Sequence, residues 1–385
     1  MELSRIDHLL QATKDLVAIE STAHNPAGLQ AACEYVLSLV RTRKQNICIE
    51  QFESGGKPSF LAYRGNKRPD KFDLILNGHV DVVPGKPEQY KPVIRDGKLY
   101  GRGVYDMKAA CVILADVFCE FVDSVPYTLG LQIVSDEESA GRDGTQYQIQ
   151  QGVHGDLVIC GESGRATTSY EIANESKGVV IADVSFSGVS AHSAYPWKGD
   201  DAIVKLANFV QTLHKHYPIP HQETDKTTIS VTSAMADSGA PSKLPDRSTI
   251  KLVARYVKGD PNFASERTFT NFIHEIDTQA DVHVLDFILP TYANPDNRFL
   301  TTLKSVASAT ENASFRYVRR HGISDGRFYN AVGGEACEFG IAGENAHGDN
   351  EYIPVVAFEN YLRTMHRFLH ETQSFAVNAT SSHKR

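Results

Sequence analysis

Short apolar runs alternate with helical patterns from the N-terminus to about residue 175. Four runs are bounded by polar residues or glycine and have the length of strands: "FDLILNG", "TLGLQIVS", "DLVICG" and, much later, "ACEFGIAG". Continuous apolar runs of this length are typical of strands that are covered on both faces. Their alternation with helical patterns predicts a mostly parallel α/β sheet, with further helices over residues 298–310 and after Pro354.

The pattern changes between residues 177 and 289. Strand-like runs and two helical segments follow one another there in the order βαββαβ, which is typical of a compact ferredoxin-like α+β arrangement. The sequence therefore predicts a discontinuous α/β domain, residues 1–176 and 290–385, and an inserted domain, residues 177–289. A length of 385 residues agrees with two domains, because one hydrophobic core rarely serves so long a chain.

Composition narrows the class of partner. A formal charge of -8 argues against a nucleic-acid or anionic-membrane surface, since those partners select for clustered Lys and Arg. No apolar run approaches the roughly 18 residues of a membrane span, and charges interrupt the N-terminal stretch, unlike a signal peptide. The 6 cysteines form no CxxC pair, which is typical of reduced thiols. We expect a cytoplasmic protein that acts on a small molecule or peptide.

Ionisable residues follow each predicted parallel strand. In chain order they are His79 and Asp81, then Asp136, Glu137 and Glu138, then Glu162, and finally Glu344 and His347. Open α/β sheets bind ligands beyond the carboxyl ends of their strands, so these side chains should meet at one edge. Carboxylates gathered there repel one another and lose solvation unless a cation compensates. The sequence therefore predicts a metal site.

A further carboxylate, Asp106, opens the predicted amphipathic helix that runs through Val112, Ala115 and Phe118. Alone it would be an ordinary N-cap, but together with the strand-end residues it completes a set of five candidate ligands: His79, Asp106, Glu138, Glu162 and His347. Imidazole and carboxylate ligands without thiolate favour zinc or a similar divalent ion in a catalytic role. Five ligands serve two ions if one carboxylate bridges them.

Among the ionisable residues outside this ligand set, two can be given other roles. Asp81, two residues after His79, can accept a hydrogen bond from the second nitrogen of the imidazole and so fix its tautomer. Glu137, which adjoins the ligand Glu138, can accept a proton from an attacking water and return it to a leaving amine. These roles predict metal-dependent hydrolysis of an amide bond.

Six motifs follow one another along nearly the whole chain: "GHVDVVPG", "GKLYGRGVYDMKAA", "SDEESAGRDGTQ", "GES", "GVSAHSAYP" and "NAHGDNEYIP". In this order they resemble the M20 metallopeptidases, the amidohydrolase family that includes acetylornithine deacetylase, succinyl-diaminopimelate desuccinylase and glutamate carboxypeptidase. The resemblance implies two Zn²⁺ ions, for which Co²⁺ or Mn²⁺ can substitute. It implies that His79 and Glu162 bind one ion, that Glu138 and His347 bind the other, that Asp106 bridges them, and that Glu137 is the general base.

The resemblance also implies that the inserted domain is a lid and a homodimerisation surface. His192 in "GVSAHSAYP" is similar to the lid histidine that, in dimeric relatives, reaches the partner's active site and stabilises the tetrahedral oxyanion; the alternative is a polar loop histidine. Arg255 and Arg327 look similar to arginines that hold a substrate carboxylate, although structural ion pairs are the alternative.

Ser324 lies in "GISDG", which matches the GxSxG nucleophile elbow of serine hydrolases. That elbow needs a strand before it, a long helix after it, and an acid and then a histidine well downstream. Here another strand-like run follows quickly, and His347 comes too soon for the acid-bearing strand. Ser324 is therefore expected to be a substrate-loop residue.

The fold class that follows is α/β: a mostly parallel-sheet zinc-hydrolase catalytic domain with an inserted α+β ferredoxin-like lid. The expected substrate is an N-acyl amino acid or small peptide, with a dipeptidase or glutamate-carboxypeptidase-like exopeptidase as the alternative. Desuccinylases commonly carry arginines where "NESKGVV" has Lys177, which argues against a succinylated diaminopimelate substrate. A non-catalytic binding protein on the same fold is disfavoured, because Glu137 and all five ligands are present.

Overall fold

A computed structural model describes residues 3–375 of the chain. It separates into two compact units. Unit 1 takes in the chain up to Glu175, Thr291–Arg320 and the chain from Ser324 onward, and unit 2 is Ser176–Pro290 with His321–Ile323. Unit 2 differs from the predicted insert, 177–289, by one residue at each end and by the short segment His321–Ile323, which no sequence pattern distinguishes.

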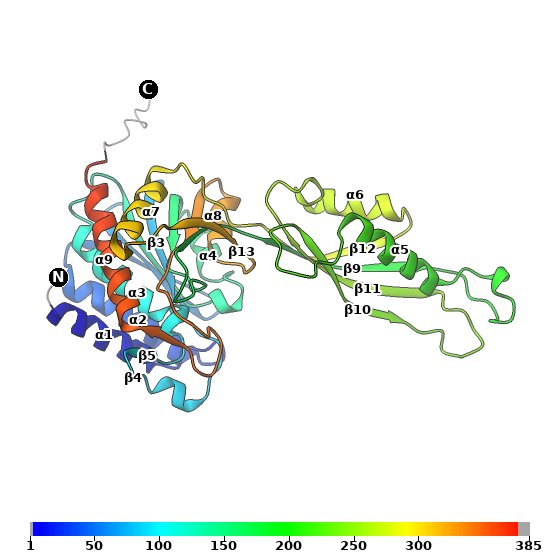
Figure 1. The fold of residues 1–385 in the computed structure, drawn as a ribbon, viewed down its shortest axis with the longest axis horizontal. Coiled ribbons are helices and arrows are strands. Elements are labelled where there is room, and N and C mark those ends of the chain that lie inside the picture. Colours follow the sequence, from blue (N-terminus) through cyan, green and yellow to red (C-terminus); the bar gives the residue numbers. More distant parts are fainter. Residues whose placement is uncertain (1–2, 376–385) are drawn as a thin grey trace, which may run out of the picture. The chain divides into compact units, whose positions relative to one another are not determined.

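Unit 1 is built on an eight-stranded sheet within the described residues, with the strand order β1-β2-β6-β3-β7-β14-β8-β13 (Figure 1). The four central strands run parallel to one another: β6 (Leu129–Val134), β3 (Phe72–His79), β7 (Gly155–Cys160) and β14 (Glu335–Glu338). The outer strands are β1 (Ile47–Ser54), β2 (Lys57–Arg64), β8 (Glu171–Ser176) and β13 (Arg316–Arg320). The four apolar runs predicted as buried parallel strands each contain one, although β14 ends at Glu338, within its run.

Helices cover both faces of this sheet. Along β3, Leu74 and Leu76 enter the larger hydrophobic core, whereas Ile75 points into a smaller core on the opposite face. The larger core packs against α1 (Leu3–Val17), α2 (Pro26–Arg43), α3 (Ala109–Phe121), α7 (Arg298–Glu311) and α9 (Val355–Thr372). The smaller core packs against α4 (Thr145–Gln150) and α8 (Gly326–Ala331). This layered arrangement is the predicted α/β class.

The helix after the "GRGVYDMKAA" motif differs from the prediction. α3 begins at Ala109 rather than at Asp106, whose backbone is not helical (φ -119°, ψ 89°) and whose side chain does not cap the helix. The helix is also not amphipathic, because 12 of its 13 residues are buried and only Glu120 is not. α1, α2 and α9 pack around it in addition to the sheet, which leaves it no solvent face.

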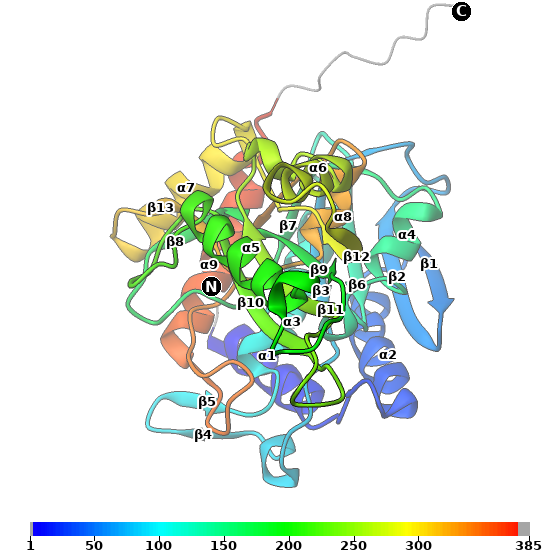
Figure 2. The same ribbon diagram turned by 90° about the vertical axis from the view of Figure 1, so that its right-hand side faces the viewer.

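Unit 2 follows the predicted βαββαβ order. Its elements are β9 (Gly178–Ser187), α5 (Ala202–His216), β10 (Thr228–Ala236), β11 (Arg247–Tyr256), α6 (Glu266–Ile276) and β12 (Asp281–Ile288). The strands form an antiparallel sheet in the order β10-β11-β9-β12, and α5 and α6 lie on one face of it (Figure 2). Phe186, Phe209 and Phe269 fill the core between sheet and helices. The ferredoxin-like prediction is confirmed.

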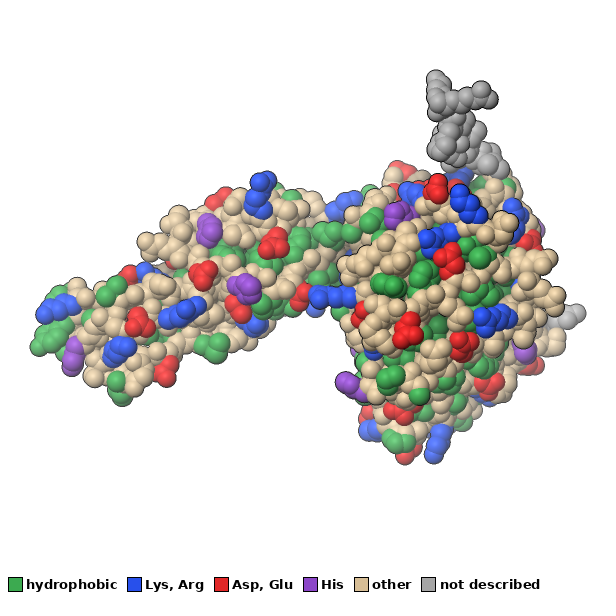
Figure 3. Space-filling model, turned by 180° about the vertical axis from the view of Figure 1, so that it is seen from behind, with side chains coloured by type: hydrophobic (Ala, Val, Ile, Leu, Met, Phe, Trp, Pro, Cys, Tyr) green, Lys and Arg blue, Asp and Glu red, His purple; other side chains and the backbone are tan. Residues whose placement is uncertain are grey.

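A small third sheet joins two distant segments of unit 1. Its strands are β4 (Val93–Arg95), β5 (Lys98–Tyr100) and β15 (Tyr352–Pro354), in the order β15-β5-β4. On the face seen in Figure 3, Lys and Arg are interspersed with Asp and Glu on each unit. Within residues 3–375 no helix combines the length and hydropathy that a membrane span requires.

Candidate metal centre

Four of the five candidate ligands follow the carboxyl ends of the four central strands of unit 1, and the fifth, Asp106, lies between β5 and α3. His79 is the last residue of β3, and Glu162 follows β7 by two residues. Glu137 and Glu138 lie in a 3-10 turn, Glu137–Ser139, which begins three residues after the last residue of β6. His347 lies in the loop between β14 and β15. Since these strands are parallel neighbours, their ends place the side chains at one edge of the sheet.

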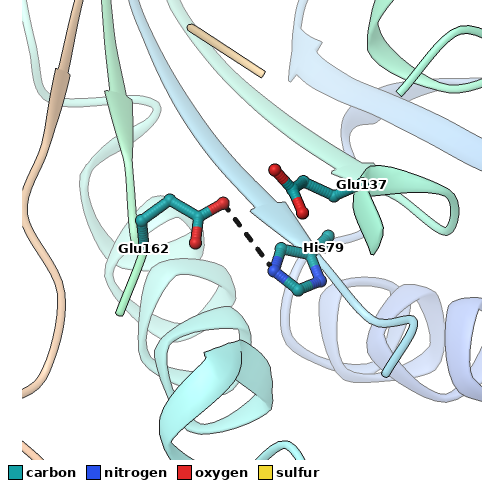
Figure 4. Close-up of side chains that lie close together, drawn as sticks. All are labelled: His79, Glu137 and Glu162. Carbon is teal, nitrogen blue, oxygen red and sulfur yellow. Dashed lines mark ion pairs between the residues drawn. The ribbon is translucent and has the colours of Figure 1, made fainter. Parts of the chain in front are cut away.

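His79, Glu137 and Glu162 form the first group of possible ligands. One ligand atom from each lies within 4.8 Å of the others. His79 Nε2 is 3.7 Å from Glu162 Oε1, and Figure 4 shows the carboxylate of Glu137 projecting toward the same space. The His79 side chain is only 1% exposed, whereas Glu137 and Glu162 are partly exposed.

Asp106, Glu138 and His347 form the second group, again with one ligand atom from each within 4.8 Å of the others. His347 Nε2 lies 3.0 Å from Glu138 Oε1 and 3.2 Å from Asp106 Oδ2. The His347 side chain is 53% exposed, in contrast to that of His79. The two groups therefore differ chiefly in the exposure of their histidines, and the second is the more open to solvent.

The carboxylate of Asp106 lies between the two histidines. Its Oδ1 is 3.2 Å from His79 Nε2, and its Oδ2 is 3.2 Å from His347 Nε2. Each carboxylate oxygen of Asp106 thus faces the imidazole of a different group, which is the arrangement that a bridging ligand requires. The peptide bond between Asp106 and Met107 is cis.

Asp81 supports this site in two ways. His79 Nδ1 lies 3.1 Å from the backbone oxygen of Asp81 and 3.4 Å from its Oδ1. The carboxylate also accepts hydrogen bonds from the backbone N–H groups of Glu137, at 3.3 Å, and Glu138, at 3.0 Å. The second contact was not predicted, because it joins residues more than 50 positions apart and has no local sequence signal.

The electrostatics of the cluster indicate a place for a cation. Burial raises the pKa of Glu162 to about 7 and raises that of Glu137 well above the usual range. Burial lowers the pKa of His79, but the charge of Glu162 and hydrogen bonds with Asp106 and Asp81 outweigh it, so the pKa is well above 6.5. Hydrogen bonds with Asp106 and Glu138 raise the pKa of His347 to about 10. Protonated groups therefore offset the negative charge of the buried carboxylates. A divalent ion would offset this charge more fully.

The donor set also fits zinc. It consists of imidazole nitrogens and carboxylate oxygens, which suit a catalytic Zn²⁺ site. Cys111 lies nearby, but its Sγ donates a hydrogen bond to the backbone oxygen of His79 at 3.0 Å. Burial raises the pKa of the Cys111 thiol to about 12, so it stays protonated and is no ligand.

His192 and Arg255 belong to unit 2. His192 is exposed, and its Nδ1 accepts a hydrogen bond from the backbone N–H of Ala194 at 3.0 Å, which leaves Nε2 to carry the ring proton. Arg255 is half-buried, and burial lowers its pKa. Its Nη1 lies 3.5 Å from the backbone oxygen of His321, and no carboxylate among the described residues pairs with it. Both side chains have free donors.

Arg327 and Ser324 lie in unit 1 and are buried. Arg327 Nη1 donates to the backbone oxygen of Ser324 at 2.7 Å, and Nη2 donates to that of Ala140 at 2.5 Å. Ala140 directly follows the 3-10 turn that carries Glu137 and Glu138. These contacts favour the structural alternative for Arg327.

Sequence reasoning missed Glu338. This residue ends β14, beside the end of β7, and burial followed by the charge of Glu162 raises its pKa to about 7. The signal is present in "ACEFG", but the apolar residues on both sides of Glu338 predict an uninterrupted strand up to Ile341. Because β14 ends three residues earlier, Glu338 is another carboxylate at the strand edge.

Comparison with known proteins places these features in a family. The family model for peptidase family M20/M25/M40 matches residues 75–371. A succinyl-diaminopimelate desuccinylase from Methylobacillus flagellatus is 26% identical over 376 residues, which cover 92% of this chain and 96% of that protein.

Solved structures show the same fold at lower sequence identity. Aminopeptidase PepT from Bacillus cereus aligns with a TM-score of 0.74 and 18% identity, over 95% of this chain and 98% of its own. A dinuclear metal-binding M20 peptidase from Bacillus subtilis aligns with a TM-score of 0.67 and 12% identity, over 97% of this chain and 100% of its own. The alignments cover both units.

Proposed function

Because the chain belongs to peptidase family M20/M25/M40 and is thus a hydrolase of amide or peptide bonds, we propose that it binds two Zn²⁺ ions and hydrolyses an N-acyl amino acid or a small peptide. The observation that carries the proposal is the position of Asp106, whose two oxygens each lie 3.2 Å from a different histidine. A dinuclear metal-binding peptidase among the similar structures supports it.

In this proposal His79 and Glu162 hold one ion, Glu138 and His347 hold the other, and Asp106 contacts both. Zn²⁺ at such a site polarises a carbonyl group and lowers the pKa of water, and Co²⁺ or Mn²⁺ can substitute for it. The His79 side chain is buried and that of His347 is half exposed, which supports substrate entry from the His347 side.

Glu137 acts as the general base. Its backbone N–H donates to Asp81 Oδ1 at 3.3 Å, which holds the side chain at the edge of the first ligand group. Burial raises its pKa, so the carboxyl group can retain a proton taken from water until the leaving amine accepts it. Asp81 thus positions both an imidazole and the base.

Two side chains of unit 2, His192 and Arg255, take part in substrate recognition in this proposal. His192 carries its ring proton on Nε2 and can donate a hydrogen bond to the oxyanion of the tetrahedral intermediate. Arg255 has no carboxylate partner among the described residues and can bind the substrate carboxylate. Ser324 remains a predicted substrate-loop residue, whereas the guanidinium of Arg327 is already engaged by two carbonyl groups.

Homodimerisation through unit 2 is part of the proposal. β10 is an edge strand of the sheet, and Met235 on it is 65% exposed. Trp197 and Val204 are also exposed, at 75% and 54%. Edge strands and apolar side chains of this kind are typical of surfaces that pair with another chain. Light scattering after gel filtration measures the oligomeric state, and a monomer would refute this part of the proposal. The cytoplasmic location stays a prediction.

The reaction is tested by measuring amine release from a panel of substrates. The panel contains N-acetylornithine, N-succinyl-diaminopimelate, other N-acyl amino acids and simple dipeptides, each with zinc-loaded and chelator-treated protein. We expect chelator-sensitive release from at least one class. Release that chelation leaves unchanged would refute the metal site, and silence across the panel would refute the substrate class.

A further inference from the structure

Two segments that carry candidate ligands are held together by the small sheet. In it, Tyr352 pairs with Tyr100 and Ile353 with Leu99. The backbone N–H of Gly101 also donates to the backbone oxygen of Glu351 at 3.2 Å. The chain that leaves β5 toward Asp106 therefore runs against the chain that arrives from His347.

Glu351 is buried at this junction, and both of its carboxylate oxygens accept two hydrogen bonds. Oε1 accepts from the backbone N–H groups of Tyr105, at 2.9 Å, and Asp106, at 3.1 Å. Oε2 accepts from the backbone N–H of Gly103, at 2.9 Å, and from Arg102 Nη1, at 2.8 Å. One carboxylate thus fixes the backbone of the segment that presents Asp106 to both histidines.

Arg102 extends this network to the second ligand segment. It is 2% exposed, and its Nη2 donates to the backbone oxygen of His347 at 3.2 Å. The backbone of His347 is left-handed (φ 63°), a conformation that residues other than glycine rarely adopt, and its side chain is half exposed. Neither packing nor backbone preference therefore holds this ligand, and polar contacts to its loop must do so.

We propose that Arg102 and Glu351 are positioning residues that set the metal affinity of the ligand group Asp106, Glu138 and His347. The proposal rests on the two-ion function above. A buried ion pair that served only the fold would stabilise the protein without regard to ions. Here the contacts converge instead on the backbone of two ligands that lie 241 positions apart in the chain.

The two residues make different contributions. Glu351→Gln keeps the shape but replaces one acceptor oxygen by an amide donor, so that two of the four hydrogen bonds are lost in either orientation. This displaces the backbone segment that presents Asp106 and so affects both ions. Arg102→Lys keeps the positive charge beside Glu351, but one ammonium group cannot also reach the carbonyl of His347. It therefore affects the ion on the His347 side alone.

Binding of Co²⁺ alone to metal-free, full-length protein tests this. Bound equivalents and visible absorption are followed as Co²⁺ is added to wild type, Arg102→Lys, Glu351→Gln and the control Arg5→Lys. Arg5 also pairs with a buried carboxylate, donating from Nε to Asp116 Oδ2 at 3.1 Å, but contacts no candidate ligand. We expect about 10- to 100-fold weaker binding of one ion in Arg102→Lys and of both ions in Glu351→Gln. The control should match wild type.

The outcomes separate this inference from the proposed function. Two ions bound to wild type, with unchanged affinities in both variants, would overturn the positioning role and leave the function intact. Weakening of equal size in Arg5→Lys would also overturn it, because any lost ion pair would then have the same effect. Wild type that binds no ion would refute the two-ion function and the inference with it. Glu351→Gln, the isosteric variant, carries the test where Arg102→Lys does not fold.

Discussion

Replacement of Glu137 by Gln distinguishes a general base from a metal ligand, the two roles that its position permits. The side chain lies with His79 and Glu162 in one group of possible ligands. As a general base, Glu137 is essential to proton transfer and dispensable for metal binding. As a ligand, it would be essential to metal binding, and its replacement would lower the metal content of the protein.

The expected effect on metal content and on kcat follows from the ligands that remain in Glu137→Gln. His79, Glu162 and Asp106 still offer three ligands to the ion on that side, which is the usual number for a catalytic zinc site. We therefore expect two bound ions in Glu137→Gln. Loss of general acid–base catalysis typically lowers kcat by about 10²- to 10⁴-fold, equivalent to about 3–5 kcal/mol of transition-state stabilisation.

The assay pairs metal analysis with steady-state kinetics on the best substrate of the panel. Glu138→Gln is the matched control, because it alters the adjacent carboxylate of the other ligand group, where His347 Nε2 lies 3.0 Å away. The control should lose metal, whereas Glu137→Gln should lose kcat alone. Turnover of Glu137→Gln near that of wild type, or loss of one ion from it, would refute the base assignment.

Four further outcomes are expected. Asp106→Asn should reduce bound metal below two equivalents by elemental analysis, because its amide turns a donor toward one histidine; full occupancy would contradict the bridging role. Metal affinity should rise from pH 5 to pH 8 in calorimetric titrations, because Glu162, with a pKa of about 7, and His347, with a pKa of about 10, must release protons to bind; a flat profile would contradict this. His192→Gln should lower kcat about 10²- to 10³-fold at unchanged metal content; unchanged kcat would make it a simple loop residue. Leu76→Ala, at a fully buried position, should reduce the free energy of unfolding in urea by about 2–5 kcal/mol, and a change below 1 kcal/mol would contradict its place in the core.

The parts of the site that the sequence predicts are those with a local cause. β3 and β7 are apolar runs that end in glycine or a polar residue, and His79 and Glu162 stand at or just beyond those ends. A strand end fixes both the place and the direction of a side chain, so parallel neighbours are enough to bring such residues together. The order of elements in unit 2 also has a local cause, because its strands show an alternating or a continuous apolar pattern within their own sequences.

Other features depend on packing between distant segments. α3 was predicted to be amphipathic, yet α1, α2 and α9 enclose it, and only its composition, with Asp116 and Glu120 as the charged residues, hinted at this. The contacts of Asp81 with two backbone N–H groups join β3 to the turn after β6. No periodicity encodes such contacts, because they depend on how loops meet rather than on the elements that the loops connect.

The two histidines of the site show the same division within one functional centre. His79 is the last residue of a central strand, is 1% exposed, and has its ring oriented by Asp81 two residues further along the chain. His347 has a left-handed backbone in a loop and is 53% exposed. The position of His347 depends on the contact with Arg102 and on the small sheet, because the order of the strands does not fix this loop. The second ligand group is therefore only as well ordered as these polar contacts make it, and this is why buried residues outside the ligand set bear on metal binding.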